Sequence, residues 1–385
     1  MIRVAYFSES SSIYDAFLVT RLSEMSGVSI LTFNQKPEIK VSVPIITLPL
    51  PFGKLPGHDS PRIYSTLSIK AFFLQRYLRI LKPDILVGCG LDYGLSSALS
   101  GFQPFFSFIW GSEVLSPPKL FPFRAMIKFV LARASQVLVD SEVQVEACLQ
   151  LGCRRDKVLS LPWVDSFELD SKLKGIDPDR EGFRRSLGWS VDDLIVVCTR
   201  SHAPIYNIEC VLESAPDVID KAGNARFLFV GGGPLTSRLK ELATELGLGR
   251  KVHFTGRVEQ ARLFRCLRNS DLYVSSSLSD GTSASLVEAM TCHLPCVVSN
   301  IAGNREWIAD GRNGFLFPPR DSKRLSELLI DLATDELARR RMGDAGFETS
   351  ISRGNWKTNS SRLLSALEDL SARKGQPLRQ ALPKV

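Results

Sequence analysis

The stretch Ser279-Asp280-Gly281-Thr282-Ser283-Ala284-Ser285-Leu286-Val287-Glu288-Ala289-Met290 carries the features on which the fold and the chemistry of this chain depend. An apolar strand is predicted just upstream, at residues 272–274, and a helix is predicted to begin at 283–285. The first turn of a helix leaves backbone N–H groups unpaired, so this junction is expected to bind an anion. Two carboxylates, Asp280 and Glu288, bracket the helix start, and both are expected to reach the same ligand.

Strands and helices are predicted to alternate on both sides of this stretch. In the second half of the chain, helices separate strands expected at 194–198, 226–230, 252–255, 272–274 and 295–298. The first half has the same pattern, with strands expected at 2–7, 28–33, 83–87, 105–109, 136–139 and 157–161. Such alternation predicts parallel sheets with helices on both faces. We therefore expect an α/β protein with two Rossmann-like α/β/α domains that face each other across a cleft.

The expected domain boundaries lie where the alternation stops. Residues 1–165 form the first predicted domain and residues 191–355 the second. Residues 166–190 lack strand periodicity, so they are expected to form an interdomain linker with a short helix at 182–187. One amphipathic helix is predicted at 325–342. A terminal helix at 356–370 is expected to pack back on the first domain, followed by a basic tail at 371–385.

The composition indicates a globular protein and gives a first indication of its partners. With 385 residues, 44% of them hydrophobic and 23% charged, the chain is long enough for about two domains. The net charge of +7 arises unevenly, because the region from Lys40 to Arg133 contains eleven Lys and Arg residues but four Asp and Glu. No basic motif interleaved with aromatic residues accompanies this excess, so nucleic acid is not expected as a partner. An anionic membrane surface or a phosphorylated substrate fits better.

The sequence also favours a cytoplasmic protein and does not predict a metal centre. Residues 1–7 are predicted to form a first strand rather than a signal peptide, and no uncharged stretch predicts a membrane span. Eight cysteines follow no disulfide framework, so we expect reduced thiols and a cytoplasmic protein, peripheral at the inner membrane face if it is membrane-associated. Cys292-His293-x-x-Cys296 lacks a second pair of ligands, so no metal site is predicted.

A glycine-rich turn is the second candidate for ligand binding. Gly231-Gly232-Gly233 follows a predicted strand, but the next residues do not keep the G-x-G-x-x-G spacing of dinucleotide-binding turns. The turn lets a ligand approach the backbone closely at the carboxyl edge of a sheet, where open α/β sheets bind ligands.

A nucleotide sugar needs a neutralised diphosphate and acceptors for its hydroxyl groups. The helix start serves the first need, and Asp280 with Glu288 the second. Alternatively, Asp280 is a capping residue and Glu288 a solvated one.

Residues 273–321 resemble the nucleotide-sugar site of glycosyltransferase family 4, whose members are retaining enzymes of GT-B fold. The family's motif of two glutamates separated by seven residues corresponds here to Asp280 and Glu288. The resemblance is strong in the second half and looser in the first. It includes Ala289-Met290, Leu294-Pro295-Cys296-Val297-Val298, Ala302-Gly303, Asp310-Gly311-x-Asn313-Gly314-Phe315-Leu316, Val252-His253-Phe254-Thr255-Gly256-Arg257-Val258, Val230-Gly231-Gly232-Gly233-Pro234, Lys82-Pro83-Asp84 and Trp110-Gly111-Ser112-Glu113.

The resemblance implies a metal-independent, retaining glycosyltransferase without a cofactor. Its second domain would bind a nucleoside-diphosphate sugar, and its first a glycan or lipid-linked acceptor. Asp280 and Arg200 are the implied catalytic residues, near the transferred sugar and the diphosphate. The remaining implied contacts are Glu288 on the ribose hydroxyls, Gly281, Thr282 and Ser283 on the sugar, Ser285 and Leu286 on the diphosphate, and Gly256 and Val258 along the nucleobase, with Gly231 and Gly232 nearby.

The chain departs from the family pattern at several positions. The first motif acid is the shorter Asp280, and Tyr206 stands where the family's diphosphate clamp usually has a lysine, a role that His202 could partly take over. Ser8-Glu9-Ser10-Ser11-Ser12 replaces a glycine-rich loop, and Trp110 stands where many relatives carry a histidine. Two alternatives therefore stay open. One is a catalytically weak nucleotide-sugar-binding relative that acts as an assembly partner, and the other is a sugar-nucleotide epimerase of similar fold.

Two predicted helices in the first domain combine bulky apolar and basic residues, at 62–81 and 119–133. Core packing with a solvated basic rim is the default interpretation of this pattern. Docking on an anionic membrane surface is the alternative, and it would suit a lipid-linked acceptor.

Overall fold

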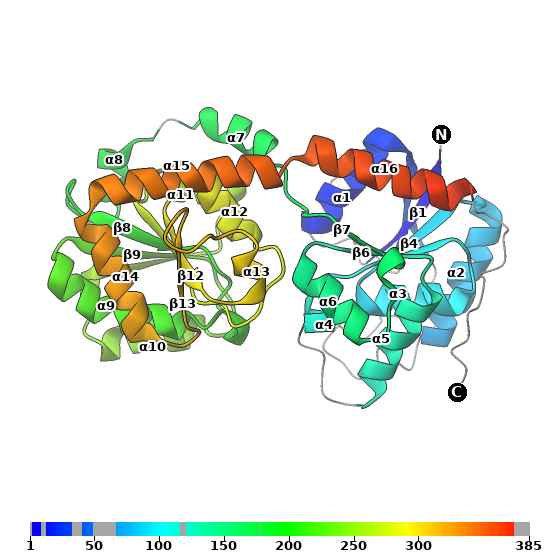
Figure 1. Ribbon diagram of the computed structural model, residues 1–385, viewed down its shortest axis with the longest axis horizontal. Helices are drawn as coiled ribbons and strands as arrows, with labels where there is room; N and C mark the ends of the chain where they lie inside the picture. The colour runs from blue at the N-terminus through cyan, green and yellow to red at the C-terminus, as the bar shows by residue number, and fades with distance from the viewer. Residues whose placement is uncertain are drawn as a thin grey trace. The chain divides into compact units, whose positions relative to one another are not determined.

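The computed structural model describes residues 2–8, 13–32, 41–48, 67–115, 121–176 and 178–372. The chain forms two compact units (Figure 1). The first holds the residues up to Trp163 together with the C-terminal helix from Lys357 onward, and the second extends from Val164 to Trp356. Each unit contains one parallel sheet with helices packed against it.

The sheet of the first unit has the strand order β3-β2-β1-β4-β5-β6-β7, and all neighbouring strands are parallel. The chain therefore starts inside the sheet, builds outward to β3, and returns to add β4 on the other side of β1. The strands are β1 (Arg3–Phe7), β2 (Gly27–Thr32), β3 (Ile45–Thr47), β4 (Ile85–Cys89), β5 (Phe105–Phe108), β6 (Gln136–Val139) and β7 (Val158–Ser160). The helices are α1 (Ile13–Met25), α2 (Leu67–Leu81), α3 (Gly90–Ser100), α4 (Ser112–Leu115), α5 (Phe121–Arg133), α6 (Glu142–Gln150) and α16 (Trp356–Ala372), with a 3₁₀ turn η2 (Arg155–Lys157).

The sheet of the second unit has the parallel order β10-β9-β8-β11-β12-β13. Its strands are β8 (Leu194–Cys198), β9 (Ala225–Val230), β10 (Val252–Gly256), β11 (Leu272–Ser275), β12 (Cys296–Ser299) and β13 (Phe315–Phe317). The helices are α7 (Ser166–Lys174), α8 (Arg180–Ser186), α9 (Ile208–Ala222), α10 (Thr236–Glu245), α11 (Gln260–Arg268), α12 (Ala284–Thr291), α13 (Ala302–Arg305), α14 (Ser322–Thr334) and α15 (Glu336–Arg353), with 3₁₀ turns η3 (Pro204–Tyr206) and η4 (Gly249–Lys251).

The central strand β8 shows why the second sheet is covered on both faces. All five of its residues are buried, because successive side chains point to opposite faces and each face has its own core. Val196 and Cys198 pack into the core beneath α9, α10 and α14. Ile195 and Val197 pack into the other core, beneath α8, α11 and α12.

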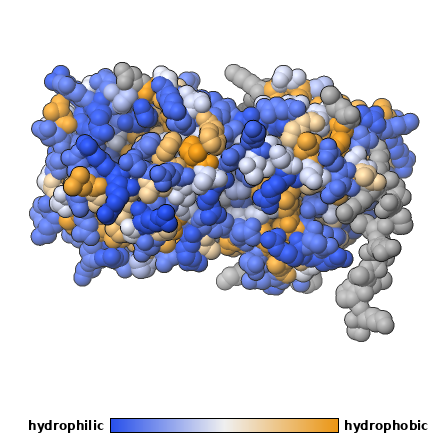
Figure 2. Space-filling view, turned by 45° about the horizontal axis from the view of Figure 1, so that its top comes forward, coloured by the Kyte–Doolittle hydropathy of each residue, from blue (hydrophilic) through white to orange (hydrophobic). Residues whose placement is uncertain are grey.

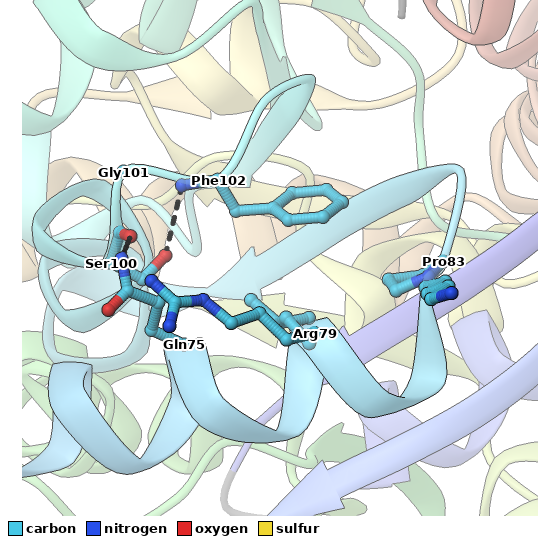
Figure 3. Close-up of a pocket in the computed structure, with 8 residues that line it drawn as sticks. Gln75, Arg79, Pro83, Ser100, Gly101 and Phe102 are labelled. Atoms are coloured by element: carbon cyan, nitrogen blue, oxygen red, sulfur yellow. Dashed lines mark hydrogen bonds between the residues drawn. The ribbon is translucent and has the colours of Figure 1, made fainter.

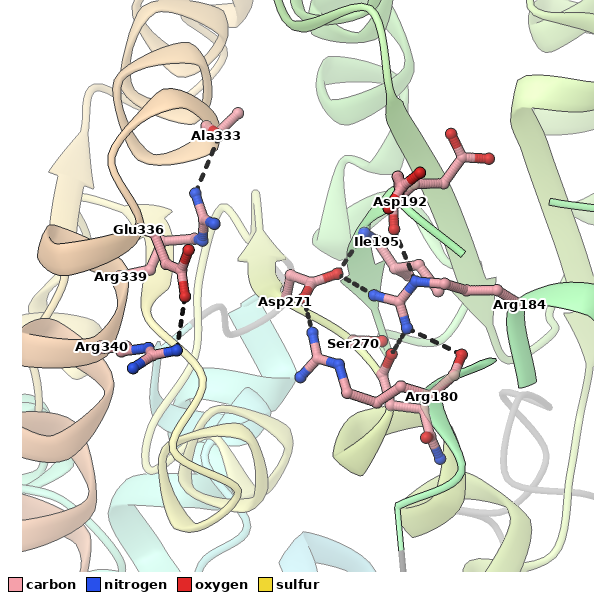
Figure 4. Close-up of polar contacts among 12 residues, drawn as sticks. Arg180, Arg184, Asp192, Ile195, Ser270, Asp271, Ala333, Glu336, Arg339 and Arg340 are labelled. Atoms are coloured by element: carbon pink, nitrogen blue, oxygen red, sulfur yellow. Dashed lines mark hydrogen bonds and ion pairs between the residues drawn. The ribbon is translucent and has the colours of Figure 1, made fainter. Parts of the chain in front are cut away.

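The segment predicted as a linker, 166–190, contains α7 and α8 in the structure, and both belong to the second unit. Ion pairs fix α8 there (Figure 4). The buried guanidinium of Arg184 donates to the Asp271 carboxylate at 2.6 Å and to the Asp193 carbonyl at 2.7 Å. Arg180 also pairs with Asp271, whose carboxylate accepts from the Ile195 N–H at 2.8 Å. The start of β8, the start of β11 and α8 are thereby joined through one carboxylate.

The prediction of one helix over 325–342 is wrong. The chain leaves helical geometry at Asp335, where φ is −116° and ψ is 93°, and this residue separates α14 from α15. The Asp335 carboxylate accepts from the Ala338 N–H at 2.9 Å and so caps the new helix. An apolar period alone does not reveal this break, because both helices keep a buried face.

None of the helices formed by residues placed in the structure is long and apolar enough to cross a bilayer. On the face drawn in Figure 2, apolar residues (orange) occur as separate patches among hydrophilic ones (blue).

Candidate functional site

The candidate site lies at the carboxyl ends of β8, β9 and β11 in the second unit. The sheet order places β8 between β9 and β11, so the connections leaving the neighbouring strands β8 and β11 diverge to opposite sides, toward β9 and β12. Such a switch point leaves room above the strand ends in open α/β sheets. Arg200 follows β8, Gly231 follows β9 and Asp280 follows β11, so the topology gathers three segments that are distant in the sequence.

Arg200 is the residue that holds this site together. Its guanidinium donates from Nη2 to the Asp280 carboxylate at 2.6 Å, and from Nη1 to the hydroxyls of Ser283 and Ser285, each at 2.7 Å. The Arg200 side chain is only 8% exposed, and that of Asp280 is 20% exposed. The structure therefore places both sequence-predicted catalytic residues together, with Arg200 directly before the first turn of α12.

The start of α12 keeps part of its expected capacity for an anion. Ser283 is the N-cap, and its hydroxyl and carbonyl both accept from the Leu286 N–H, at 3.4 and 3.1 Å. The amide of Leu286, which was expected on the diphosphate, is therefore already engaged, and its side chain is fully buried. In the described part of the chain, the N–H groups of Ala284 and Ser285 have no acceptor, so they remain available to a ligand.

Tyr206 takes part in the site in a way that the sequence did not reveal. The guanidinium carbon of Arg200 lies 4.0 Å from the centre of its ring, which is the geometry of a cation–π interaction. The backbone holds this ring in place, because the Ser276 hydroxyl donates to the Tyr206 carbonyl at 3.0 Å and the Leu278 N–H donates to the Ile205 carbonyl at 2.8 Å. Tyr206 thus supplies a π surface to Arg200 where the family usually has a lysine.

Glu288 is a half-buried carboxylate that no described residue hydrogen-bonds. It lies one turn inside α12, and burial raises its pKa to about 7, although the nearby charge of Arg200 acts in the opposite direction. An acceptor that is withdrawn from water and left unpaired is costly in a folded protein. Such a group gains hydrogen bonds when a ligand with hydroxyl groups arrives.

The glycine turn after β9 is pressed against the segment that carries Arg200. Gly231 has a φ of 145°, and a Cβ there would lie 2.9 Å from the Arg200 carbonyl oxygen. A Cβ at Gly233 would lie 2.6 Å from the His202 carbonyl oxygen. The Gly231 N–H donates to the Gly256 carbonyl at 3.0 Å, so the ends of β9 and β10 are joined here. The glycines are therefore required for packing as well as for access.

Three other sequence-predicted contacts lie around this turn. His202 is fully buried, and its Nδ1 lies 2.9 Å from the Thr236 hydroxyl. Burial and the charge of Lys240 lower the pKa of His202, which disfavours the charged imidazolium that a phosphate would attract. Gly232 packs against the Arg257 side chain, and Val258 is a partly buried residue at the edge of the core beneath α11 and α12.

Two supporting residues were given no role in the site by the sequence analysis. The Tyr273 hydroxyl donates to the Ser285 hydroxyl at 2.9 Å, and so orients one of the Arg200 partners. Gly303 packs closely against the backbone of residues 280–281, because a Cβ there would lie 2.4 Å from the carbonyl oxygens of Asp280 and Gly281. Gly281 is buried and Thr282 is half-buried beside it. The position of Tyr273 on β11, the strand that leads into the loop, was the available signal.

In the first unit, a second set of turns lies at the carboxyl edge of the sheet. The Glu113 carboxylate accepts from the N–H groups of Leu91 at 3.2 Å and Gly111 at 3.1 Å, so it joins the turns after β4 and β5. Burial raises the pKa of Glu113. Trp110, which stands in the family's histidine position, packs edge-on against Phe108 with ring centres 4.4 Å apart. Residues 9–12 of the serine-rich loop lie outside the described residues.

The predicted absence of a metal site at Cys292-His293-x-x-Cys296 is not tested by this structure, but the local contacts are clear. Both cysteines are buried. The ring of His293 stacks on Phe347 at 4.1 Å, and its Nδ1 lies 2.9 Å from the Asp344 carboxylate.

The sequence matches two family models. Residues 179–349 match the glycosyl transferases group 1 family, and residues 3–141 match the glycosyl transferase 4-like family. A GDP-mannose-dependent monoacylated alpha-(1-6)-phosphatidylinositol monomannoside mannosyltransferase of Corynebacterium glutamicum is 26% identical over 197 residues, which cover 49% of this chain and 51% of the relative. N-acetyl-alpha-D-glucosaminyl L-malate synthase of Bacillus anthracis is 26% identical over 171 residues, 44% of each. The chain thus spans about half the length of these curated relatives.

Solved structures show the same fold over nearly the whole chain. Sucrose-phosphate synthase of Thermosynechococcus elongatus superposes with a TM-score of 0.81 at 18% identity, covering 97% of this chain and 100% of the other. Anabaena HepE in complex with UDP superposes with a TM-score of 0.74 at 17% identity, covering 96% of this chain and 100% of the other. The fold of the two α/β units is therefore GT-B, as the sequence predicted.

Proposed function

We infer that the chain, which belongs to the glycosyl transferases group 1 family of GT-B fold, moves a sugar from a nucleoside-diphosphate sugar to a glycan or lipid-linked acceptor with retention of configuration. One observation carries this proposal. Arg200 and the unpaired amides of α12 lie beside Asp280, on the same helix start as the unpaired Glu288 carboxylate. A diphosphate requires a cation and N–H donors such as Arg200 and these amides. Ribose hydroxyls require an acceptor such as the Glu288 carboxylate.

The geometry supports a division of roles along the donor. Negative charge develops on the diphosphate as the glycosidic bond to it breaks, and preorganised donors stabilise that charge most strongly in the transition state. Arg200 and the amides of Ala284 and Ser285 occupy this role. Glu288 accepts from the ribose hydroxyls. Asp280 orients Arg200 and accepts from a hydroxyl of the transferred sugar.

Retention follows from a transfer that occurs on one face of the sugar. The bond from the anomeric carbon to the diphosphate oxygen breaks, the acceptor oxygen forms its bond on the same face, and the acceptor proton passes to the departing phosphate. No side chain then acts as a nucleophile. This fits Asp280, whose carboxylate is already held by Arg200 at 2.6 Å. Arg200 and the helix start supply the positive charge, so the proposal requires neither a metal nor a cofactor.

A nucleotide-sugar-binding protein without turnover is the second candidate. The observation that favours it is the Arg200–Asp280 ion pair, because this pair neutralises the cation and Tyr206 adds no charge of its own. The two candidates share the donor site and differ in whether sugar leaves the donor in the presence of an acceptor.

Ligand-induced stabilisation tests the shared donor site. We expect one of UDP, GDP or ADP, or a sugar conjugate of it, to raise the melting temperature, since a ligand at about 100 times its Kd stabilises a protein by about 2.7 kcal/mol. The relatives do not fix the base, because one is GDP-mannose-dependent and a solved neighbour is a complex with UDP. Transfer to an added glycan acceptor, followed by NMR of the anomeric proton, then separates the enzyme from the binding protein. If no nucleotide shifted the melting temperature, the donor site would be refuted.

Replacing Tyr206 with alanine is expected to weaken binding of the active nucleotide about 5- to 30-fold. The expectation follows because a partly desolvated cation–π contact is worth about 1–2 kcal/mol and Arg200 loses the surface that holds it. Tyr206→Phe keeps the ring face and should bind within about twofold of the wild type. Isothermal titration of both variants measures the difference. Equal losses in the two variants would show that the hydroxyl, and not the ring face, is what matters.

A further inference from the structure

One layer of helices on the first unit exposes apolar side chains to solvent. α3 packs between α2 and α5, and Figure 1 shows the three side by side. Four large hydrophobic side chains of this layer are exposed: Phe72 by 61%, Ile80 by 68%, Leu99 by 45% and Phe129 by 40%. No other large hydrophobic residue of the first unit is exposed within the residues that the structure describes. We call this surface of α2, α3 and α5 the docking face.

The docking face also carries cations without carboxylate partners. Arg76, Arg79 and Lys82 are exposed on or directly after α2, and Arg124 and Lys128 are exposed on α5. α2 and α5 contain no Asp or Glu, and the one carboxylate of α3, Asp92, is held by the buried Lys70 at 2.8 Å. Across the described ranges, no carboxylate lies within ion-pair distance of these five cations. Core packing explains neither the unpaired charges nor the exposed apolar groups.

A pocket of about 410 Å³ lies within this face, where α2 and α3 end (Figure 3). α2 ends because Lys82 takes a left-handed φ of 47° and Pro83 follows it. Gln75 ties the two helices together by donating to the Ser100 carbonyl at 3.2 Å. The apolar residues Leu78, Pro83 and Phe102 line the pocket together with the cations Arg79 and Lys82.

The dipole of α2 accounts for the cations at its C-terminal end, Arg79 and Lys82, but not for the other cations of the docking face. Arg79 lies in the last turn of α2, where a cation complements the helix dipole. Arg76 lies a turn earlier, and Arg124 lies at the start of α5, where a cation is unfavourable for the dipole. The exposed charges on the docking face are therefore available to an anionic partner outside the chain.

We propose that the docking face binds an anionic lipid bilayer, with the cations on the phosphates and Phe72, Ile80, Leu99 and Phe129 in the interfacial region. The pocket between α2 and α3 takes the apolar part of one lipid beneath its headgroup. Amphipathic helices with basic and bulky apolar residues bind membranes in this way. The inference goes beyond the proposed transfer reaction and does not depend on it, because every residue involved lies on the first unit outside the site described above.

The chemistry of the face favours lipid over nucleic acid. Single-stranded nucleic acid binds through bases that stack on aromatic rings. Ile80 and Leu99, two of the four exposed apolar groups, offer no ring. Aliphatic side chains next to cations instead match an interface that is charged at the surface and apolar beneath.

Vesicle sedimentation with the full chain tests the proposal. Wild-type protein should sediment with vesicles of phosphatidylcholine mixed with phosphatidylglycerol, and much less with phosphatidylcholine alone. The triple variant R76Q/R79Q/K82Q should lower the partition coefficient about 100-fold, since each cation near an anionic surface contributes about fivefold. F72S/I80S should weaken binding while leaving the charge unchanged. Inorganic phosphate should compete no better than chloride at equal ionic strength, which separates a bilayer from a site for free phosphate.

A matched variant shows whether position matters or only net charge. K251Q/K323Q/R341Q removes three exposed cations of the second unit, and it should bind the vesicles like the wild type. Circular dichroism confirms that each variant folds. Equal vesicle binding by the two triple variants would overturn the proposal, and so would a docking-face site that prefers an oligonucleotide to the vesicles. Transfer to a water-soluble acceptor should be unchanged in R76Q/R79Q/K82Q, so failure of this proposal and failure of the proposed function are distinguishable.

Discussion

Replacing Arg200 with alanine is expected to lower kcat/KM for sugar transfer by about 100- to 1,000-fold, the effect of removing one preorganised donor from a developing negative charge. Among the residues that the structure describes, Arg200 is the one that hydrogen-bonds Asp280, Ser283 and Ser285 together. The same substitution removes the positive charge that counteracts the rise in the pKa of Glu288. Initial rates over a range of donor concentrations measure the loss.

Two measurements distinguish a role in charge stabilisation from a role in folding. R200A leaves the half-buried Asp280 carboxylate without its partner, so its melting temperature should fall. R200K keeps the positive charge but loses the planar fork that reaches two hydroxyls and a carboxylate. We expect R200K to bind the nucleotide better than R200A and to remain well below the wild type in kcat. A folded R200A protein within tenfold of wild-type kcat/KM would contradict the role given to Arg200.

Much of the fold could be predicted because its causes are local. Alternating apolar segments specified both parallel sheets, and β8 illustrates why, since a strand buried on both faces is apolar throughout. The segment 166–190 could not be placed in this way. Its attachment to the second unit depends on Arg184 meeting Asp271, 87 residues away, and no local pattern encodes that contact. The break at Asp335 was missed because a capping aspartate also occurs inside polar helix faces.

The helix start of the site could be predicted from the sequence, but the hydrogen-bond network around Arg200 could not. The small polar loop before an apolar helix predicted a helix start at 283–285, and the structure has the N-cap at Ser283. The partners of Arg200 depend on β8 and β11 being neighbours, which is a property of the whole sheet. The same holds for Tyr206, whose ring meets Arg200 only because the 275–278 backbone anchors η3. The sequence showed only that Tyr206 stands where the family usually has a lysine, whereas the structure shows its ring in contact with Arg200.

Replacing Glu288 with glutamine is expected to weaken binding of the nucleotide sugar about 10- to 100-fold, because hydrogen bonds to a charged group contribute about 1.5–3 kcal/mol. The pH dependence should change as well. Burial raises the pKa of Glu288 to about 7, so the carboxylate forms as the pH rises through that value. Wild-type affinity should increase about tenfold between about pH 6 and pH 8, following that ionisation, and E288Q should lose this dependence. The sugar conjugate must be the ligand, because the terminal phosphate of a free diphosphate also titrates near pH 6.

As the pH rises, the stability of the ligand-free protein should fall while its affinity for the nucleotide sugar increases. The pKa of Glu288 is higher in the folded chain than in the unfolded chain, so the folded protein binds the extra proton. The stabilisation linked to this proton is fully present below the ordinary glutamate pKa, and it is lost as the pH rises through about 7. At pH 8 the wild type holds a desolvated, unpaired charge, and E288Q should therefore melt at a higher temperature than the wild type.

The combination of weaker binding with higher stability separates a ligand-binding carboxylate from a structural one. E348Q, at an exposed position of α15, is the matched control and should change neither quantity. If Glu288 were a solvated helix residue, E288Q would behave like E348Q. If it supported the fold, E288Q would melt below the wild type at every pH. Only a desolvated, unpaired carboxylate that gains hydrogen bonds from a ligand destabilises the ligand-free protein at pH 8 and stabilises the complex.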